Sequence, residues 1–315
     1  MPNRPLALRP EGAATLWMLS SALSFSLMGA CVKAVGSRIP EAEVVLARSL
    51  VSLVLSLAML RQAGLSPWGQ RRALLVLRGV VGTAALLCVF AALVRLPLAV
   101  ATVLQYLQPT ATAILAWLLL RERIGLRVVI AALLGLLAVV LLTEPKELVR
   151  LLAPLAGPWL ENLYGLRPEA LPLDGVLLAL AGALLSAVAY VSVRALGRSE
   201  HPLVIVFYFP LVGLVMMAPM VALDPVLPTP TEALALVGVG VFTQLGQIGI
   251  TNGLTGMPAA RATALSYGQV PLAVLWGWWF FREPLDPDTA VSAALVLAAT
   301  LLSLRRAPRA AAGGR

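Results

Sequence analysis

The sequence predicts an all-α polytopic membrane protein in which ten transmembrane helices form two inverted five-helix repeats. Three observations predict this fold class. First, 60% of the 315 residues are hydrophobic and only 12% are charged, whereas soluble domains are about half apolar and about a quarter charged. Second, the apolar residues fall into ten long runs, and third, an offset of 161 residues aligns the two halves of the chain. The composition excludes a soluble enzyme, a disordered protein and a disulfide-rich secreted scaffold.

Each of the ten runs has roughly the length of about 20 residues that a helix needs to cross a bilayer. Charged residues, prolines and glycines separate the runs. The expected spans are 13–35, 42–60, 73–93, 98–120, 126–142, 175–196, 203–223, 233–254, 259–281 and 289–304. The connection after the fifth span is long and Pro-rich, so we expect four parts: a first repeat (1–143), a linker (144–173), a second repeat (174–305) and a basic tail (306–315).

The internal repeat is clearest in two segments, PLAVATVLQYLQ at 97–108 and PAARATALSYGQ at 258–269. From position 97 to position 122, 10 of 26 residues are identical to those 161 positions later, against about one in ten expected by chance in a chain so rich in Leu and Ala. Each repeat has an odd number of helices, so the second must enter the membrane in the opposite orientation. Inverted repeats are typical of alternating-access transporters.

The net charge of +9 indicates how the chain is oriented. With the N-terminus inside, 16 of the 24 basic residues fall on the cytoplasmic side. The positive-inside rule therefore predicts that both termini are cytoplasmic, and it explains the basic character without a nucleic-acid partner. The composition, rich in Ala, Leu, Arg and Pro, favours a bacterial inner (plasma) membrane. Cys31 and Cys88 lie in apolar runs without metal or redox spacing, so we expect free thiols, no metal and no cofactor.

Two segments carry a family resemblance, LQYLQPTATAILAWLLLRE at 104–122 and LSYGQVPLAVLWGWWFFRE at 265–283. Together with the two five-helix halves, they resemble the drug/metabolite transporter superfamily, and most of all its ten-helix EamA-domain branch. Arg121 and Arg282 stand where that family commonly has glycine. Within the branch, four segments of the first half are similar to bacterial S-adenosylmethionine carriers and to the eukaryotic solute carrier family 35 G group: 25–33, 47–49, 77–79 and 96–101. The resemblance implies a metabolite transporter, but its motif marks the fold and not the substrate.

Each repeat has a proline near the centre of its fourth expected span, Pro109 and Pro271. A proline inside a helix frees a carbonyl group and kinks the helix. Polar side chains accompany both prolines: Gln105, Tyr106, Gln108, Ser266, Tyr267 and Gln269. Such groups are costly against lipid, so we expect them to line a cavity. The alternative is that they join neighbouring helices through hydrogen bonds.

Differences between the repeats are more informative about the substrate. Arg48 lies eight residues after Pro40, about 12 Å into the second span, and its repeat counterpart is Phe209. Arg78, whose counterpart is Val239, lies about 9 Å into the third span. A guanidinium can bind carboxylate or phosphate through two parallel hydrogen bonds. We therefore expect Arg48 to bind substrate, while Arg78 could bind substrate or extend to the cytoplasmic surface.

The eighth expected span adds a polar stripe without a polar counterpart in the first repeat. Gln244, Gln247 and Thr251 follow helical spacing and share one face. This face could bind a polar metabolite or pack against another helix. Lys33 and its counterpart Arg194 lie near helix ends and are expected to anchor them at the membrane surface, with gating as the alternative.

The positions of the acidic residues disfavour several chemistries. All 15 are expected in loops or at helix ends, and the single histidine, His201, precedes a proline in a loop. An intramembrane enzyme would need paired acids, a metal cluster or a Ser/His pair at depth. Cation–proton exchange, as in the small multidrug members of the superfamily, would need a buried carboxylate. Neither is expected here.

The expected function is therefore secondary active transport of small polar or anionic metabolites, such as amino acids or organic acids, by alternating access. The alternatives are a transporter of larger metabolites such as S-adenosylmethionine or nucleotide-type solutes, a passive channel and, least favoured, an intramembrane enzyme. The expected partners are a small-molecule substrate and the lipid bilayer, with the chain as a monomer or weak homodimer.

Overall fold

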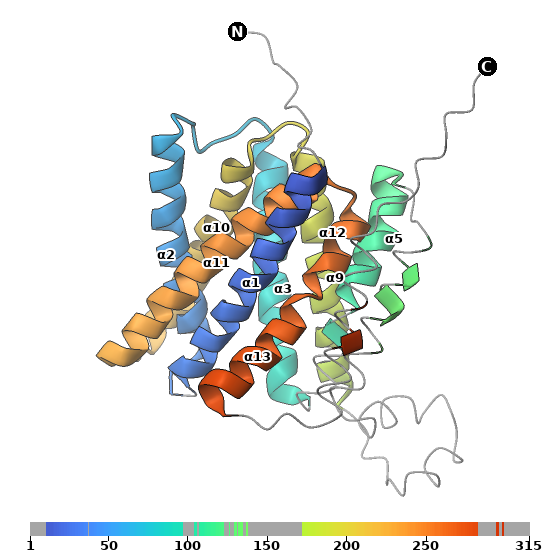
Figure 1. The fold of residues 1–315 in the computed structure, drawn as a ribbon. Coiled ribbons are helices and arrows are strands. Elements are labelled where there is room, and N and C mark those ends of the chain that lie inside the picture. The colour runs from blue at the N-terminus through green and yellow to red at the C-terminus, as the bar shows by residue number, and fades with distance from the viewer. Residues whose placement is uncertain are drawn as a thin grey trace, which may run out of the picture.

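The computed structural model describes residues 11–36, 38–96, 104–105, 107–122, 126, 129–130, 132–134, 137, 172–282, 294–295 and 298. Tyr106, most of the expected linker and the basic tail lie outside the described residues. The described part consists of helices joined by short connections (Figure 1). The chain is an all-α polytopic membrane protein, as the sequence predicts.

The helices occur in the predicted order. Their bounds are α1 Glu11–Val35, α2 Glu41–Gln62, α3 Arg72–Arg95, α5 Gln108–Leu120, α9 Leu173–Leu196, α10 Pro202–Leu223, α11 Pro230–Gly256, α12 Ala259–Ser266 and α13 Gln269–Phe281. Within the described residues, six helices are long and apolar enough to cross a membrane: α1, α2, α3, α9, α10 and α11. These are the first three expected spans of each repeat.

The two repeats end their helices at equivalent positions. At the offset of 161 residues, α2 matches α10 and α5 matches α13 at both ends. Arg121 and Arg282, which follow α5 and α13, both have φ of 54°. Residues other than glycine rarely adopt this left-handed conformation, so the same local helix stop recurs in both halves of the fold.

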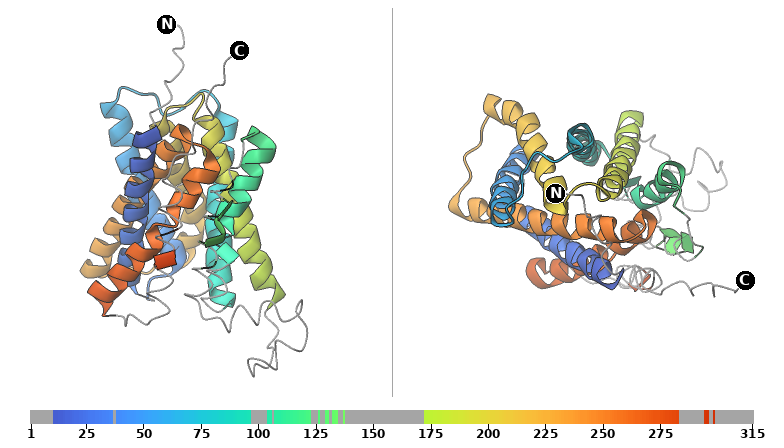
Figure 2. Two further views of the ribbon diagram at one scale, coloured as in Figure 1. Left: turned by 45° about the vertical axis from the view of Figure 1, so that its right-hand side comes forward. Right: turned by 90° about the horizontal axis from the view of Figure 1, so that it is seen from above.

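Most contacts between a helix of one repeat and a helix of the other recur between their repeat counterparts. Helix α1 packs against α11, and the equivalent pair is α9 with α3. Helices α2 and α11 are in contact, as are their counterparts α10 and α3, whereas α2 and its own counterpart α10 pack together. This pattern is that of a two-fold pseudosymmetry between the repeats, whose axis passes between α2 and α10. These two helices lie next to each other at one side of the bundle (Figure 2).

Helices α1 and α11 cross closely because α11 presents glycines to α1. A Cβ atom at Gly249 would lie 2.7 Å from the Trp17 carbonyl oxygen, and one at Gly253 would lie 2.2 Å from the Met18 sulfur. The Ser21 hydroxyl donates to the Gly246 carbonyl at 2.8 Å. Small residues let helix backbones approach in membrane proteins, where lipid gives little hydrophobic drive for helix association.

The fourth span of the second repeat is interrupted shortly before its proline, and in the first repeat α5 begins at Gln108, directly before Pro109. Helix α12 ends at Ser266 and α13 begins at Gln269, so Tyr267 and Gly268 separate two short helices. Pro271 and Pro109 therefore lie in the first turns of α13 and α5, and not in the middle of one continuous helix. A proline is tolerated in the first turn because its missing N–H has no partner there.

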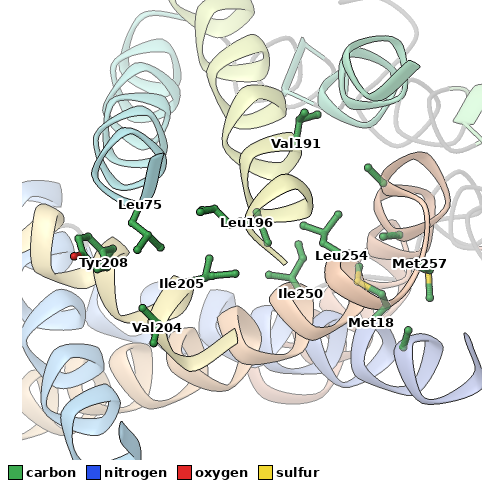
Figure 3. Close-up of a cluster of buried hydrophobic side chains, with 14 of the residues drawn as sticks. Met18, Leu75, Val191, Leu196, Val204, Ile205, Tyr208, Ile250, Leu254 and Met257 are labelled. Atoms are coloured by element: carbon green, nitrogen blue, oxygen red, sulfur yellow. The ribbon is translucent and has the colours of Figure 1, made fainter. Parts of the chain in front are cut away.

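The bundle has two ends, and one of them is closed. We call the end at which α1 begins the N-terminal face, and the end at which α1 and α13 finish the opposite face (Figure 1). Among the described residues, the largest cluster of buried apolar side chains comes mainly from the first turns of α1, α3 and α10 and the last turns of α2, α9 and α11. These helix ends lie at the N-terminal face (Figure 1). Figure 3 shows Leu75, Leu196, Ile205, Ile250 and Leu254, from four helices, directed toward one another.

Candidate substrate-binding cavity

A cavity of about 800 Å³ lies within the bundle, between the two repeats. Seven helices line it: α1, α2, α3, α9, α10, α11 and α13. It extends from the centre toward the opposite face, where Lys33 in the last turn of α1 and Phe281 at the end of α13 belong to its wall. Five of the residues predicted to bind substrate line this cavity: Arg48, Arg78, Gln105, Gln247 and Gln269.

The two arginines meet at one aromatic ring. The guanidinium carbon of Arg48 lies 5.1 Å from the centre of the Phe209 ring, and that of Arg78 lies 4.4 Å from it. Arginine stacks favourably on an aromatic face. Phe209 is also the repeat counterpart of Arg48, so the two meet where the symmetry axis passes between α2 and α10.

Arg78 is directed into the bundle and not toward the surface. It is only 2% exposed, and its Nη2 donates to Oε1 of Gln247 at 3.1 Å. Gly82, one turn further along α3, provides room for it, since a Cβ there would lie 2.6 Å from Nη1 of Arg78 and 3.1 Å from the Phe209 ring. Arg78 thus belongs to the cavity wall and does not extend to the membrane surface.

The positive charge of the two arginines is not neutralised by the protein residues around them. Among the described residues that line the cavity, none is acidic. The Nε atoms of Arg48 and Arg78 are buried without a hydrogen-bond partner. Burying an unpaired charge in a low-dielectric interior is costly. This arrangement favours a ligand that brings negative charge into the cavity.

The remaining wall is largely apolar and aromatic. It includes Phe25, Met28, Leu86, Val89, Trp276 and Phe281. The indole N–H of Trp276 donates to the Ser26 hydroxyl at 2.9 Å, which joins α13 to α1 and fixes the ring. Tyr190 on α9 lines the same cavity. Sequence reasoning missed Tyr190 and Trp276, although Tyr190 is the single aromatic residue in its expected span.

Three other residues that the sequence predicts to bind substrate lie outside the cavity wall. Gln244 is 2% exposed and its Nε2 donates to the Ser56 hydroxyl on α2 at 2.9 Å. It faces α2 because a three-residue step along a helix turns the side chain by about 60° relative to Gln247. Gln108 donates to Thr112 at 3.2 Å within α5, and Tyr267 is fully buried between α12 and α13. The structure does not place these three residues in the cavity wall.

Arg194 links the repeats at the N-terminal face. Its Nε donates to Oε1 of Glu122 at 2.7 Å, and the side chains are only 18% and 12% exposed. The other carboxylate oxygen of Glu122 accepts from the Ala259 amide at 2.8 Å, at the start of α12. A carboxylate at a helix N-terminus is favourable. Glu122, shortly after α5, thus connects α9 with the start of α12. Arg194 therefore has a role in joining helices, beyond the anchoring at the membrane surface that the sequence predicts.

A second link closes the same face. The Tyr208 hydroxyl donates to the Trp68 carbonyl at 2.9 Å, and Glu200 accepts from the Gln70 amide at 2.7 Å. These bonds join the α2–α3 connection of the first repeat to α10 and the α9–α10 connection of the second. Both repeats therefore hold the N-terminal face shut through polar contacts as well as through the buried apolar cluster.

The open and closed ends are built from equivalent positions. Cavity-wall residues toward the opposite face have counterparts, 161 residues away, in the buried cluster at the N-terminal face. The pairs are Ala30 with Val191, Val32 with Val193, Val89 with Ile250, and Gly277 with Ala116. Lys33 likewise corresponds to Arg194. The same positions thus line the cavity in one repeat and belong to a closely packed cluster in the other.

Comparison with known proteins agrees with this architecture. The model of the EamA-like transporter family matches residues 12–144 and again residues 173–305. The chain is 29% identical over 282 residues to the pseudopaline exporter CntI of Pseudomonas aeruginosa, covering 89% of this chain and 92% of that protein. It is 27% identical over 278 residues to human solute carrier family 35 member G1, covering 86% and 73%.

A solved crystal structure of a protein has the same fold. It superposes with a TM-score of 0.76 and covers 93% of this chain and 96% of its own, at 23% sequence identity. At that identity the likeness concerns the fold alone.

Proposed function

Because the chain belongs to the EamA-like transporter family, we propose that it is a secondary active transporter of small polar or anionic metabolites, of the amino-acid and organic-acid class. The observation that carries this proposal is the pair Arg48 and Arg78, which face one cavity without an acidic residue among its described lining. Guanidinium groups bind carboxylates and phosphates through charge-assisted, bidentate hydrogen bonds.

The proposed mechanism is alternating access between the two repeats. The substrate enters from the opposite face, its acid group binds the guanidinium groups, and Gln247 keeps Arg78 oriented. Neutralising the arginines lowers the cost of enclosing them in an apolar interior. The opposite face then closes while the contacts at the N-terminal face separate, as the two repeats exchange conformations.

We further propose that both termini are cytoplasmic and that the membrane is the bacterial plasma membrane. The distribution of basic residues supports this orientation. The cavity described here would then open to the outside. A reporter fused to the C-terminus should report from the cytoplasm, and an external signal would refute the orientation.

A transporter of larger metabolites is the second candidate. The cavity volume of about 800 Å³ is within the range of sites for drug-sized ligands, which is wider than an amino acid needs. A similar protein is an exporter of pseudopaline, which also favours this candidate. Both candidates share an anionic group bound by the same two arginines.

The test is counterflow into liposomes that contain the purified protein. The panel comprises amino acids, organic acids, nucleosides and S-adenosylmethionine, each preloaded inside and supplied as a trace of labelled solute outside. Saturable counterflow of an anionic member supports the proposal. Absence of counterflow for the whole panel, or ohmic currents without saturation in planar bilayers, would contradict a carrier and favour a channel.

A further inference from the structure

We infer that the substrate carries two ionised acid groups at one end, one for each guanidinium. This inference rests on the proposed function and narrows it, because it names the charge that the cavity requires. A single carboxylate or a zwitterion would leave one of the two arginines without a counter-charge.

The two guanidinium groups lie close to each other. Both guanidinium carbons lie close to the same Phe209 ring, at 5.1 Å and 4.4 Å from its centre. The distance between the two guanidinium carbons therefore cannot exceed the sum of these two distances. Like charges this close repel each other strongly in a medium of low dielectric constant. A ligand with two adjacent negative charges removes that repulsion and pairs both cations at once.

Among the described residues, neither arginine forms an ion pair, and none that lines the cavity is acidic. The three ion pairs among the described residues are Arg38–Glu232, Arg95–Asp174 and Arg194–Glu122, and all lie away from the cavity. Within the part of the chain that the structure describes, the hydrogen-bond acceptor of Arg78 is the neutral amide of Gln247. Each arginine also has a buried Nε without a partner. The site therefore has the donors and the charge for two acid groups.

The two parts of the cavity also differ in chemical character. Both guanidinium groups come from α2 and α3, around Phe209, whereas α1 and α13 contribute the apolar side chains of Met28, Trp276 and Phe281. Lys33 on α1 lies apart from the arginines, toward the opposite face, with its Nζ 4.6 Å from the centre of the Phe281 ring. A di-acid with an apolar body suits both parts. N-benzoyl-aspartate has this form, and N-benzoyl-asparagine has the same shape with one carboxylate fewer. The two compounds therefore form a matched pair of probes.

The experiment measures binding of the two probes to the full-length protein in lipid nanodiscs by isothermal titration calorimetry. We expect N-benzoyl-aspartate to bind about ten- to a hundredfold more tightly, the range that a lost charge-assisted contact produces. The preference should collapse in Arg48→Gln and in Arg78→Gln. Arg95→Gln, which removes a half-exposed cation paired with Asp174 outside the cavity, should retain it. Should Arg78→Gln not fold, Arg48→Gln alone decides.

Equal binding of the two probes, or no binding of either, would overturn the two-acid inference. Counterflow in liposomes separates this failure from failure of the proposed function. If another solute is transported while N-benzoyl-aspartate is not preferred, the protein is a transporter but the inference is wrong. If N-benzoyl-aspartate is preferred but no solute moves, the site holds and the proposed transport is wrong.

Discussion

Two arginines held against one phenylalanine inside a membrane protein are costly for stability. Ionised side chains in membrane interiors are expensive and are usually found where function needs them. Arg48 and Arg78 fit this description, because the protein supplies one amide and one ring but no described carboxylate as compensation. The fold should therefore tolerate the loss of one arginine better than transport does.

We predict that Arg48→Ala abolishes transport of an anionic substrate and leaves membrane insertion and folding intact. Arg48 makes no ion pair with a described residue, so its removal leaves no acidic partner unpaired. Counterflow at matched expression, together with size-exclusion profiles, measures both effects. Arg95→Ala is the control, since Arg95 lies at the end of α3 outside the cavity. Wild-type flux in Arg48→Ala would refute its role.

Gly82 gives a second test at the same site. A methyl group there would press on Nη1 of Arg78, 2.6 Å away, which is the far end of a flexible side chain. We expect Gly82→Ala to fold normally but to bind the anion more weakly, by about tenfold, the loss of one charge-assisted hydrogen bond. Gly29→Ala is the matched control, because Gly29 lines the same cavity and has free space around it. Equal affinities in the two variants would contradict the prediction.

Sequence reasoning could single out Arg48 because depth and the mismatch with Phe209 are both readable from the chain. It could not predict which helices Gln244 and Gln247 contact, since residues on one broad helix face can have different neighbours. Only packing shows that one contacts Ser56 and the other Arg78. Tyr190 was missed although its mismatch with Gly29, 161 positions earlier, is the same kind of signal as the mismatch of Arg48 with Phe209.

The helices themselves were largely predictable, because their lengths follow from the bilayer and their ends recur at the repeat offset. The interruption between α12 and α13 was not. A proline predicts a local disturbance, but whether it bends one helix or starts a second depends on the residues before it. Here Tyr267 and Gly268 separate the two helices, which lets Pro271 lie in a first turn where no N–H is needed.

The crossing of α1 and α11 leads to a prediction at this scale. We expect Gly249→Ala to lower the free energy of unfolding by about 1–3 kcal/mol, the usual cost of overpacking. The added carbon would lie 2.7 Å from the Trp17 carbonyl oxygen, and a helix backbone cannot yield as a side chain can. Thermal unfolding in detergent measures the change. Gly12→Ala, where nothing lies within 4 Å, should leave stability unchanged, and equal unfolding temperatures would contradict the argument.

For the whole molecule, the important feature is that similar halves are packed differently. Helix α11 packs against α9 and α10, whereas the equivalent pairs, α3 with α1 and α3 with α2, are scarcely in contact. This difference packs the N-terminal face shut, whereas the cavity extends toward the opposite face. Exchanging the two arrangements would produce the other state of the transport cycle. The contacts of α11 with α9 and α10 would then have to separate.

The Glu122 carboxylate holds this closure, because it bonds both Arg194 and the start of α12. We predict that Glu122→Gln shifts the protein toward the state open at the N-terminal face. Ile250, 2% exposed in the closed cluster, is a suitable reporter as Ile250→Cys, in a background where Cys31 and Cys88 are replaced by Ser. A hydrophilic thiol reagent applied from the N-terminal face should label it faster in Glu122→Gln.

The control for this prediction is an ion pair at the opposite face. Glu232, in the first turn of α11, accepts hydrogen bonds from Arg38 in the α1–α2 connection and raises the pKa of that guanidinium. Glu232→Gln therefore also removes a carboxylate that joins two parts of the chain. It lies at the start of α11, away from the closed cluster. If labelling of Ile250→Cys rises equally in both variants, the effect is general loosening of the bundle. A rise confined to Glu122→Gln assigns the closure to this carboxylate, and unchanged labelling in both would exclude it as the latch.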